Sequence, residues 1–310
     1  MNTQTNPSTW LITGSSRGFG RALAAAALRA GDRVVATARK PEQLADLAAE
    51  YGDRILAVAL DVTDPAAAEA ALAAGVERFG RIDVVVNNAG YADLSPVQTT
   101  AEADFRRQFD TNFWGVYNVS KAALPLLKKQ GAGLVIQFSS VGGRVGGTPG
   151  LGSYQAAKFA VDGLTRVLAA ETAPFGIRYL TVEPGGFATD WAGSSMGGAE
   201  IPEEYLDTVG KMSDRLRGGT TQVGDPERAA EILVRIVHAG TVPTHLVLGA
   251  GAVRLALDYS RAQIAEAAAW QAVSSSADAG AEYPVDLPDL PDLPDLPDLP
   301  DLPDLLEARQ

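Results

Sequence analysis

The sequence predicts an α/β fold in which a doubly wound parallel sheet of about seven strands carries helices on both faces. Short apolar runs rich in Val, Ile and Leu alternate with helical patterns between residues 10 and 248, which is typical of βαβ units. Right-handed crossovers between such strands make the sheet parallel. Glycine-rich or polar segments follow several of the runs, where ligands bind to such sheets. We therefore expect one large domain with its site at one edge of the sheet.

The expected strands are short and consist mainly of residues that suit burial on both faces of a parallel sheet. In chain order they are Trp10–Thr13, Val34–Ala38, Ile55–Leu60, Val84–Asn87, Leu134–Phe138, Arg178–Val182 and His245–Leu248. The helical segments between them span residues 19–30, 41–51, 65–79, 101–129, 153–173 and 226–239.

Local signals mark several helix ends. Asp64-Pro65 and Asp225-Pro226 each combine a capping side chain with a proline at the first helical position. Gly31 and Gly176 stand where a helix commonly ends with a left-handed residue. These signals set the boundaries of three crossover helices and of the segment before the sixth strand.

The composition divides the chain into a body, residues 1–277, and an acidic tail, residues 278–310. The tail holds ten acidic residues and one Arg, and residues 287–304 are six consecutive Leu-Pro-Asp units. A proline at every third position forbids an α-helix and favours extended chain. Within the body, residues 187–224 interrupt the alternation with Gly-rich stretches around a short helical piece. This pattern indicates a substrate lid, with a surface excursion that has no role as the alternative.

The composition also excludes some classes of protein and site. The chain has no Cys, so it forms neither disulfides nor thiolate zinc sites. Most of the net charge of −12 lies in the tail and the body has no basic stripe, so we expect no nucleic-acid partner. The N-terminus lacks a signal-peptide pattern and no apolar run could span a bilayer, so we expect a cytoplasmic protein without membrane contact. His238 and His245 are too few and too separated in sequence to indicate a metal site.

A Gly-rich turn follows the first strand. It reads Thr13-Gly14-Ser15-Ser16-Arg17-Gly18-Phe19-Gly20 and precedes an Ala-rich helical stretch. Glycines allow the backbone to turn sharply and approach a ligand, and the free N–H groups of the following helix attract phosphate. The turn therefore indicates a dinucleotide site, with a plain strand–helix connection as the alternative.

Tyr154 and Lys158 stand four residues apart on an expected helix, fourteen residues after Ser140. That spacing puts both side chains on one face of the helix. A neighbouring ammonium favours the phenolate, so we expect Lys158 to lower the pKa of Tyr154 below its usual value of about 10. The pair can then exchange a proton with a carbonyl or an alcohol.

Four further short motifs occur along the chain together with the Gly-rich turn and the Ser140, Tyr154 and Lys158 set. They are Asn88-Ala89-Gly90, Asn112, Pro184-Gly185 and Thr189-Asp190. The set resembles the short-chain dehydrogenase/reductase family, over roughly residues 8–270, and points to its small single-domain members. The resemblance implies a Rossmann-type fold and a nicotinamide-dependent oxidoreductase that acts on a small-molecule secondary alcohol or ketone. It does not identify the substrate.

The resemblance also assigns catalytic roles. Tyr154 is the general acid/base, and Lys158 lowers its pKa and holds the nicotinamide ribose. Ser140 orients the substrate oxygen, and Asn112 anchors a water in the proton relay. Ser139 is a weaker candidate for the Ser140 role.

One interval departs from the pattern of the family. The fourteen residues from Ser140 to Tyr154 exceed the common interval by one, and the extra residue falls in the Gly-rich loop 142–152. Such a loop can bulge. We expect the insertion to change the shape of the substrate pocket more than the catalysis.

The cofactor is expected to be NADP(H) rather than NAD(H). NAD-binding sites usually present a carboxylate after the second strand, but Ala38 and Arg39 stand there. Arg17 lies in the Gly-rich turn and, by the resemblance, faces the same ribose. Two guanidinium groups suit a 2′-phosphate. The alternative is that both arginines are surface residues without a role in binding.

By the resemblance, other cofactor contacts come from four segments. The Gly-rich turn supplies Thr13, Gly14, Ser16, Arg17, Gly18, Phe19 and Gly20. Asp61 and Val62 contact the adenine, while Asn88, Ala89 and Gly90 line the adenosine ribose. Pro184, Gly185 and Thr189 hold the nicotinamide, and Tyr154 and Lys158 face it.

Apolar side chains near these motifs favour a carbonyl substrate with an apolar body. The candidates are Leu94, Val141, Leu151, Trp191, Met196, Ile201, Tyr205 and Met212. Alternatively, several of them belong to the core or to packing within the lid. The competing function is a non-catalytic NADP-sensing regulator, which the presence of the complete Ser–Tyr–Lys set disfavours. Family members often form dimers or tetramers through the helices that carry Asn112 and Tyr154, so the resemblance implies a homo-oligomer.

Overall fold

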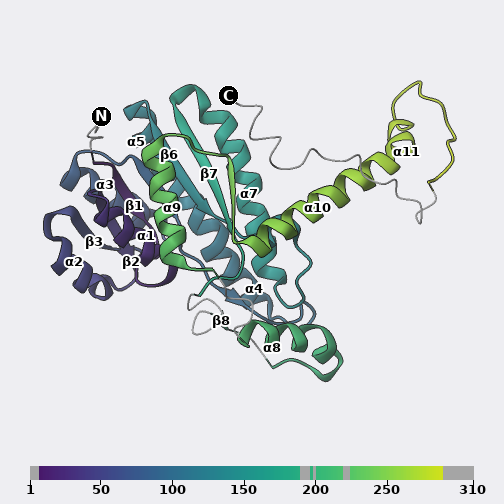
Figure 1. Cartoon of the computed structure of the whole chain (residues 1–310), viewed down its shortest axis with the longest axis horizontal. Coiled ribbons are helices and arrows are strands. Elements are labelled where there is room, and N and C mark those ends of the chain that lie inside the picture. The colour runs from purple at the N-terminus through teal and green to yellow at the C-terminus, as the bar shows by residue number, and fades with distance from the viewer. Residues whose placement is uncertain (1–6, 189–195, 198–199, 219–223, 289–310) are drawn as a thin grey trace. The chain divides into compact units, whose positions relative to one another are not determined.

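The computed structural model describes residues 7–188, 196–197, 200–218 and 224–288. The chain separates into two units, Met1–Ala252 and Val253–Gln310. The first unit contains a seven-stranded sheet in which all neighbouring strands are parallel (Figure 1). In spatial order the strands are β3 (Ile55–Ala59), β2 (Arg33–Ala38), β1 (Thr9–Ile12), β4 (Val84–Asn87), β6 (Gly133–Phe138), β7 (Ile177–Pro184) and β9 (His245–Leu248). The expected doubly wound sheet is confirmed.

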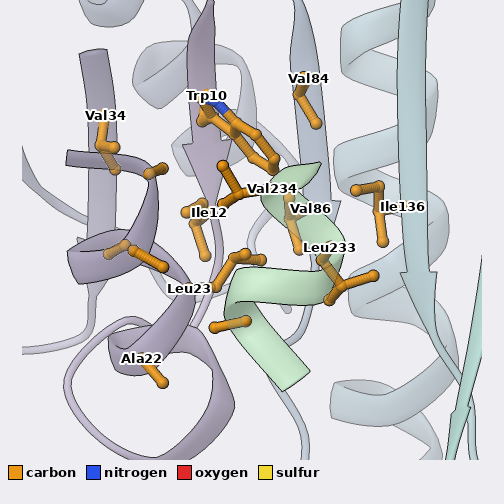
Figure 2. Packing of buried hydrophobic residues seen from close by; sticks show 14 of the residues in the cluster. Trp10, Ile12, Ala22, Leu23, Val34, Val84, Val86, Ile136, Leu233 and Val234 are labelled. Atoms are coloured by element: carbon orange, nitrogen blue, oxygen red, sulfur yellow. The ribbon is translucent and has the colours of Figure 1, made fainter. Parts of the chain in front are cut away.

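Helices cover both faces of this sheet, because successive strand residues point to opposite sides. Trp10 and Ile12 of β1 lie in one apolar cluster, whereas Leu11 between them lies in the other. The first cluster is completed by α1 (Gly18–Arg29), α2 (Ala45–Tyr51) and α9 (Pro226–Ala239). The second is completed by α3 (Pro65–Phe79), α5 (Gly115–Gln130) and α7 (Gly152–Thr172). Figure 2 shows Trp10 and Ile12 beside Leu23 of α1 and Val234 of α9.

The strand order reverses between β1 and β4. From β1 the chain adds β2 and β3 on one side and then returns to β4 on the other side. Ligands of such sheets bind at this point, beyond the carboxyl ends of the strands. The Gly-rich turn after β1, Asn88 after β4, Ser140 after β6 and Pro184 at the end of β7 therefore share one edge of the sheet.

The helix-end signals are confirmed. The Asp64 carboxylate accepts the N–H groups of Ala66 and Ala67, and the Asp225 carboxylate caps α9 in the same way. Gly31 and Gly176 have φ angles of 95° and 71°, in the region that favours glycine.

Some elements differ from expectation. The helix expected over 101–129 is divided into α4 (Glu102–Phe109), a π-helical turn (Asp110–Trp114) and α5. Such π turns insert one residue into a helix and are frequent at functional sites. Beyond β9, where no helix was expected, the chain forms α10 (Ala250–Ala269) and α11 (Gln271–Ser275). The Ala-rich sequence of α10 separates apolar from polar sides weakly, so the usual helix signal is faint.

Short elements complete the described part of the chain. They include the 3₁₀ turns Pro41–Leu44, Gly52–Arg54 and Ala173–Phe175, the short helices α6 (Gly142–Val145) and α8 (Lys211–Arg217), and β5 (Ala92–Asp93), which pairs in parallel with β8 (Met196–Gly197). The helical piece expected near residues 203–216 is a 3₁₀ turn and a π turn followed by α8. In the ranges that the structure describes, no helix is both long and apolar enough to cross a membrane.

Both histidines contact carboxylates. Asp32 is 2% exposed, and its carboxylate accepts the Ser8 N–H at 2.9 Å and the Trp10 indole N–H at 2.8 Å. His238 Nε2 lies 2.8 Å from the same carboxylate, so Asp32 joins β1 to α9. His245 Nε2 lies 2.7 Å from Asp162 Oδ1. Both pairs join elements of the fold, the second linking β9 to α7.

Candidate active site

The Gly-rich turn forms a cradle whose shape depends on its glycines. Gly14 and Gly18 have φ angles of 67° and 56°, which non-glycine residues rarely adopt. A Cβ atom at Gly20 would lie 2.3 Å from the Gly14 carbonyl oxygen, so this position accepts only glycine. Helix α1 begins at Gly18, and its free N–H groups therefore face the carboxyl edge of the sheet, where they attract phosphate.

Thr13 and Asn88 brace this cradle through the backbone. The Thr13 hydroxyl accepts the N–H groups of Asn88 and Ala89 at 2.9 and 3.0 Å. The Asn88 amide donates in return to the carbonyls of Thr13 and Gly14. Thus the two residues fix the loops after β1 and β4 to each other, at the point where the strand order reverses.

A cleft of about 1060 Å³ opens over these loops. Most residues expected to bind the cofactor or to take part in catalysis line it: Gly14, Ser16, Arg17, Gly18, Phe19, Arg39, Asp61, Val62, Asn88, Ala89, Gly90, Ser140, Tyr154, Lys158, Pro184 and Gly185. Thr13, Gly20 and Asn112 lie buried beneath it. Thr189 is outside the described residues. The volume, the glycine cradle and the helix N-terminus fit a dinucleotide.

Tyr154 is buried at the floor of the cleft and contacts Ser140. Burial raises the pKa of Tyr154 to about 12, and the hydrogen bond with Ser140 acts in the opposite, smaller sense. The expected lowering of this pKa is therefore wrong, because desolvation of the phenolate outweighs the other effects. A phenol with so high a pKa holds its proton at neutral pH and can donate it.

Lys158 is also buried, with 4% of its surface exposed. Its ammonium donates to the Phe138 carbonyl at 2.6 Å and lies 5.7 Å from the centre of the Tyr154 ring. Burial lowers the pKa of Lys158 to about 8. The structure thus brings the expected Tyr–Lys pair together, with the ammonium held by the main chain at the end of β6.

The Asn112 side chain holds the backbone at Tyr91. Its Nδ2 donates to the Tyr91 carbonyl at 2.8 Å, and its Oδ1 accepts the Tyr91 N–H at 3.1 Å. Asn112 is fully buried in the π-helical turn Asp110–Trp114. Each end of the amide thus holds the main chain at Tyr91, next to the Asn88-Ala89-Gly90 segment.

Ser139 and Ser140 have different partners. The Ser139 hydroxyl donates to the Lys158 carbonyl at 3.1 Å, so it ties β6 to α7. The Ser140 hydroxyl accepts the Gly142 N–H at 3.0 Å and shares a hydrogen bond with Tyr154. Of the two candidates, the geometry favours Ser140.

The loop with the extra residue is folded back on α7. It continues from the single turn α6 through three glycines with positive φ, at positions 146, 147 and 150. The Gln155 side chain accepts the Thr148 N–H at 3.1 Å and donates to the Thr148 hydroxyl at 2.8 Å. Ser140 and Tyr154, on either side of this loop, are in contact.

An apolar cluster adjoins Tyr154. It contains Ala92, Leu94, Leu151, Tyr154 and Val209, and partly buried Ile201, Tyr205, Met212 and Leu216 pack against it. Five residues expected to form the substrate pocket are in this cluster, namely Leu94, Leu151, Ile201, Tyr205 and Met212. Trp191 and the side chain of Met196 are outside the described residues.

Several residues of the cleft were not expected from the sequence. Phe138 and Phe187 line the cleft and pack against the ring of Phe19, with ring centres 5.5 and 4.8 Å from it. At the end near Tyr154, Tyr91, Asp93, Arg107 and Trp114 also line the cleft. Tyr91 and Asp93 directly follow the Asn88-Ala89-Gly90 segment, and this proximity is the only signal in the sequence that could have indicated them.

Comparison with known proteins identifies the family. The model for short chain dehydrogenases matches residues 8–197. The oxidoreductase BOA17 of Botryotinia fuckeliana is 49% identical over 249 residues, which cover 80% of this chain and 90% of that protein. This chain belongs to the short-chain dehydrogenase family. It is therefore an oxidoreductase of the short-chain dehydrogenase type.

Solved structures agree with this assignment. A short-chain dehydrogenase from Streptomyces avermitilis superposes with a TM-score of 0.82 at 38% identity, over 90% of this chain and 100% of that one. An alcohol dehydrogenase from Thermococcus sibiricus, solved with 5-hydroxy-NADP, gives a TM-score of 0.64 at 27% identity, over 78% and 96%. This short-chain dehydrogenase thus has the nicotinamide-binding fold of its family.

Proposed function

We propose that this short-chain dehydrogenase transfers a hydride between NADP(H) and a secondary alcohol or ketone with an apolar body. One observation carries the proposal. Ser140, Tyr154 and Lys158 meet at the floor of the cleft that contains the Gly-rich cradle, and an apolar cluster packs around Tyr154. When bound, the cofactor supplies or accepts the hydride.

The protein's own residues handle the proton. In reduction, Tyr154 donates its phenolic proton to the developing alkoxide, and burial keeps this proton in place at neutral pH. Ser140 donates a hydrogen bond to the same substrate oxygen and orients it. Lys158 faces Tyr154 and the nicotinamide ribose, and Asn112 anchors a water of the relay.

The choice of NADP(H) rests on a cationic hollow beside the cradle. It is lined by Ser16, Arg17, Arg39, Lys40 and Gln43. Three of these side chains are cationic and no carboxylate is among them, which suits a 2′-phosphate and not a 2′-hydroxyl.

The remaining cofactor contacts follow the cleft. Asp61 and Val62 contact the adenine, and Asn88, Ala89 and Gly90 line the adenosine ribose. Pro184, Gly185 and Thr189 hold the nicotinamide, and residues 187–224 act as the lid over the substrate. We assign residues 1–277 to the catalytic domain and residues 278–310 to a tail without a part in the reaction.

We further propose a homo-oligomer. Trp114 at the start of α5 is 49% exposed, and Phe159 and Val167 on α7 are 42% and 53% exposed. The two α7 residues are eight apart and so share one helix face. A second copy of this chain would cover them. A Phe159→Asp variant should then lower the mass measured by light scattering, and an unchanged mass would argue against this face as the interface.

A screen of NADPH oxidation against a library of ketones tests the reaction. We expect turnover by the wild type and a loss of about 10²–10⁴-fold in Tyr154→Phe, because the ring packs almost unchanged while the proton donor is removed. NADPH binding by this variant, followed by fluorescence, should persist. Binding without turnover of any ketone by the wild type would favour the second candidate, a non-catalytic NADP-sensing regulator.

A further inference from the structure

A partly buried ion pair ties the segment after Ser140 to strand β7. Arg144 in α6 meets Glu183 through two bonds, Nε to Oε2 at 2.5 Å and Nη2 to Oε1 at 2.9 Å. The side chains of Glu183 and Arg144 are 3% and 27% exposed. Paired guanidinium–carboxylate bonds are strong and directional, and a buried carboxylate that loses its partner is strongly destabilising. The position of α6 is therefore fixed relative to β7.

Two backbone contacts in the same segment reach the catalytic serine. The Val141 N–H donates to the carbonyl of Pro184, the residue after Glu183, at 3.0 Å. The next N–H, that of Gly142, donates to the Ser140 hydroxyl oxygen at 3.0 Å. The segment is thus joined to the end of β7 twice, by the Val141 N–H and by the Arg144–Glu183 pair. Arg144 is only two residues beyond Gly142, whose N–H binds the Ser140 hydroxyl.

Close packing leaves this segment little freedom on its other side. A Cβ atom at Gly143 would lie 2.6 Å from Ser139 Oγ and 2.7 Å from Lys158 Cβ. Helix α6 therefore rests directly on α7 at Lys158. If α6 moved, both the Ser140 hydroxyl and the surroundings of Lys158 would be displaced.

Other charges near Glu183 do not replace Arg144. His245 Nε2 lies 3.9 Å from Glu183 Oε1 but only 2.7 Å from Asp162 Oδ1. Arg166 pairs with Asp162 at 2.9 Å, and its side chain is 62% exposed. Of the described basic side chains Arg144, Arg166 and His245, only Arg144 lies in the segment that directly follows Ser140.

We propose that Arg144 is a positioning residue for the reaction: through Glu183 it holds the main chain after Ser140 so that the Ser140 hydroxyl meets Tyr154. This inference rests on the proposed function, which gives Ser140 its task. Arg144 and Glu183 themselves touch neither the phenol nor the substrate oxygen.

The kinetic test is a double-mutant cycle on kcat with the ketones found in the screen. Arg144→Met should lower kcat about ten- to a hundredfold, as expected for displacement of a catalytic group, while NADPH affinity is retained. Arg144→Lys should lose less, because it keeps the charge but not the paired bonds. In a Ser140→Ala background, Arg144→Met should add little, because the group it positions is gone. Arg166→Met, which removes an exposed pair of the same cluster, is the matched control.

A second measurement does not depend on turnover. Hydrogen exchange in the peptide 139–146 should be faster in Arg144→Met than in the wild type and unchanged in Arg166→Met. Thermal melting verifies that each variant is folded. If Arg144→Met does not fold, Glu183→Gln and Arg144→Lys take its place in both measurements.

The outcomes separate this proposal from the proposed reaction. If the kcat losses of Arg144→Met and Ser140→Ala multiply fully in the double variant, the positioning role of Arg144 is overturned. Unchanged hydrogen exchange of the peptide 139–146 in a folded Arg144→Met variant would overturn it as well. A wild type that reduces no ketone would overturn the proposed reaction, and the exchange result would then decide whether Arg144 holds the Ser140 segment.

Discussion

The buried ammonium of Lys158 should make the stability of this protein depend on pH in an unusual direction. Burial lowers the pKa of Lys158 from 10.5 to about 8. Between these two values the unfolded chain binds more protons at this residue than the folded protein does. The free energy of unfolding therefore rises as the pH increases from about 8 to 10.5. Above this window the burial of Lys158 no longer costs stability, because the side chain is neutral in both states.

The size of the effect follows from the shift. Each pKa unit corresponds to about 1.4 kcal/mol, so at pH 7 the desolvated ammonium costs about 3 kcal/mol of stability. Of this amount, about 2 kcal/mol should be regained by pH 9.5, where the folded protein holds Lys158 mostly neutral.

The assay is urea unfolding of the wild type and Lys158→Met without cofactor, at pH 7 and at pH 9.5. The variant lacks the titrating group, and the Phe138 carbonyl loses its donor equally at both pH values. The wild type should therefore gain about 2 kcal/mol relative to the variant between the two conditions. A difference that stays constant, or that moves the other way, would refute the argument from burial.

Three other predictions concern the cofactor, the fold and the tail. Arg39→Asp should weaken NADPH binding far more than NADH binding in fluorescence titrations, because the carboxylate repels a 2′-phosphate; equal effects would remove Arg39 from the site. Asp32→Ala should lower the free energy of unfolding, measured in urea, by about 3–5 kcal/mol, because three donors including His238 lose their acceptor. The control Asp53→Ala removes an exposed carboxylate and should cost under about 1 kcal/mol. Deleting residues 281–310 should leave the melting temperature and turnover unchanged, because the repeat has little apolar surface to bury; a drop of many degrees would show that the tail packs on the body.

The sequence was sufficient for the sheet because the signals that define it are local. Apolar runs, the Asp-Pro caps and the glycines of the turn act on neighbouring residues, and each was found where expected. Gly20 illustrates this, since the requirement for glycine is visible both in the motif and in its contact with the Gly14 carbonyl. The fold of the first unit therefore follows from short-range chemistry.

The electrostatics of the site depended on contacts that no local pattern reveals. The pKa of Tyr154 was expected to fall because Lys158 is near it, yet it rises because the whole fold excludes water. The partner of Arg144 lies 39 residues further along the chain, and nothing in the spacing indicates it. Asn112 was recognised by its motif, but its use in holding Tyr91 is apparent only in three dimensions.

The glycines between Ser140 and Tyr154 differ in how much space surrounds them. A side chain at Gly143 would strike Lys158 of α7, whereas one at Gly147 would meet no atom within 4 Å. Gly147 has a φ angle of 73°, so a substitution there strains the backbone although the space is open. We therefore expect this stretch to tolerate changes in length near Gly147 better than near Gly143, and under the proposed function substrate preference could vary there while Ser140 and Tyr154 keep their contact.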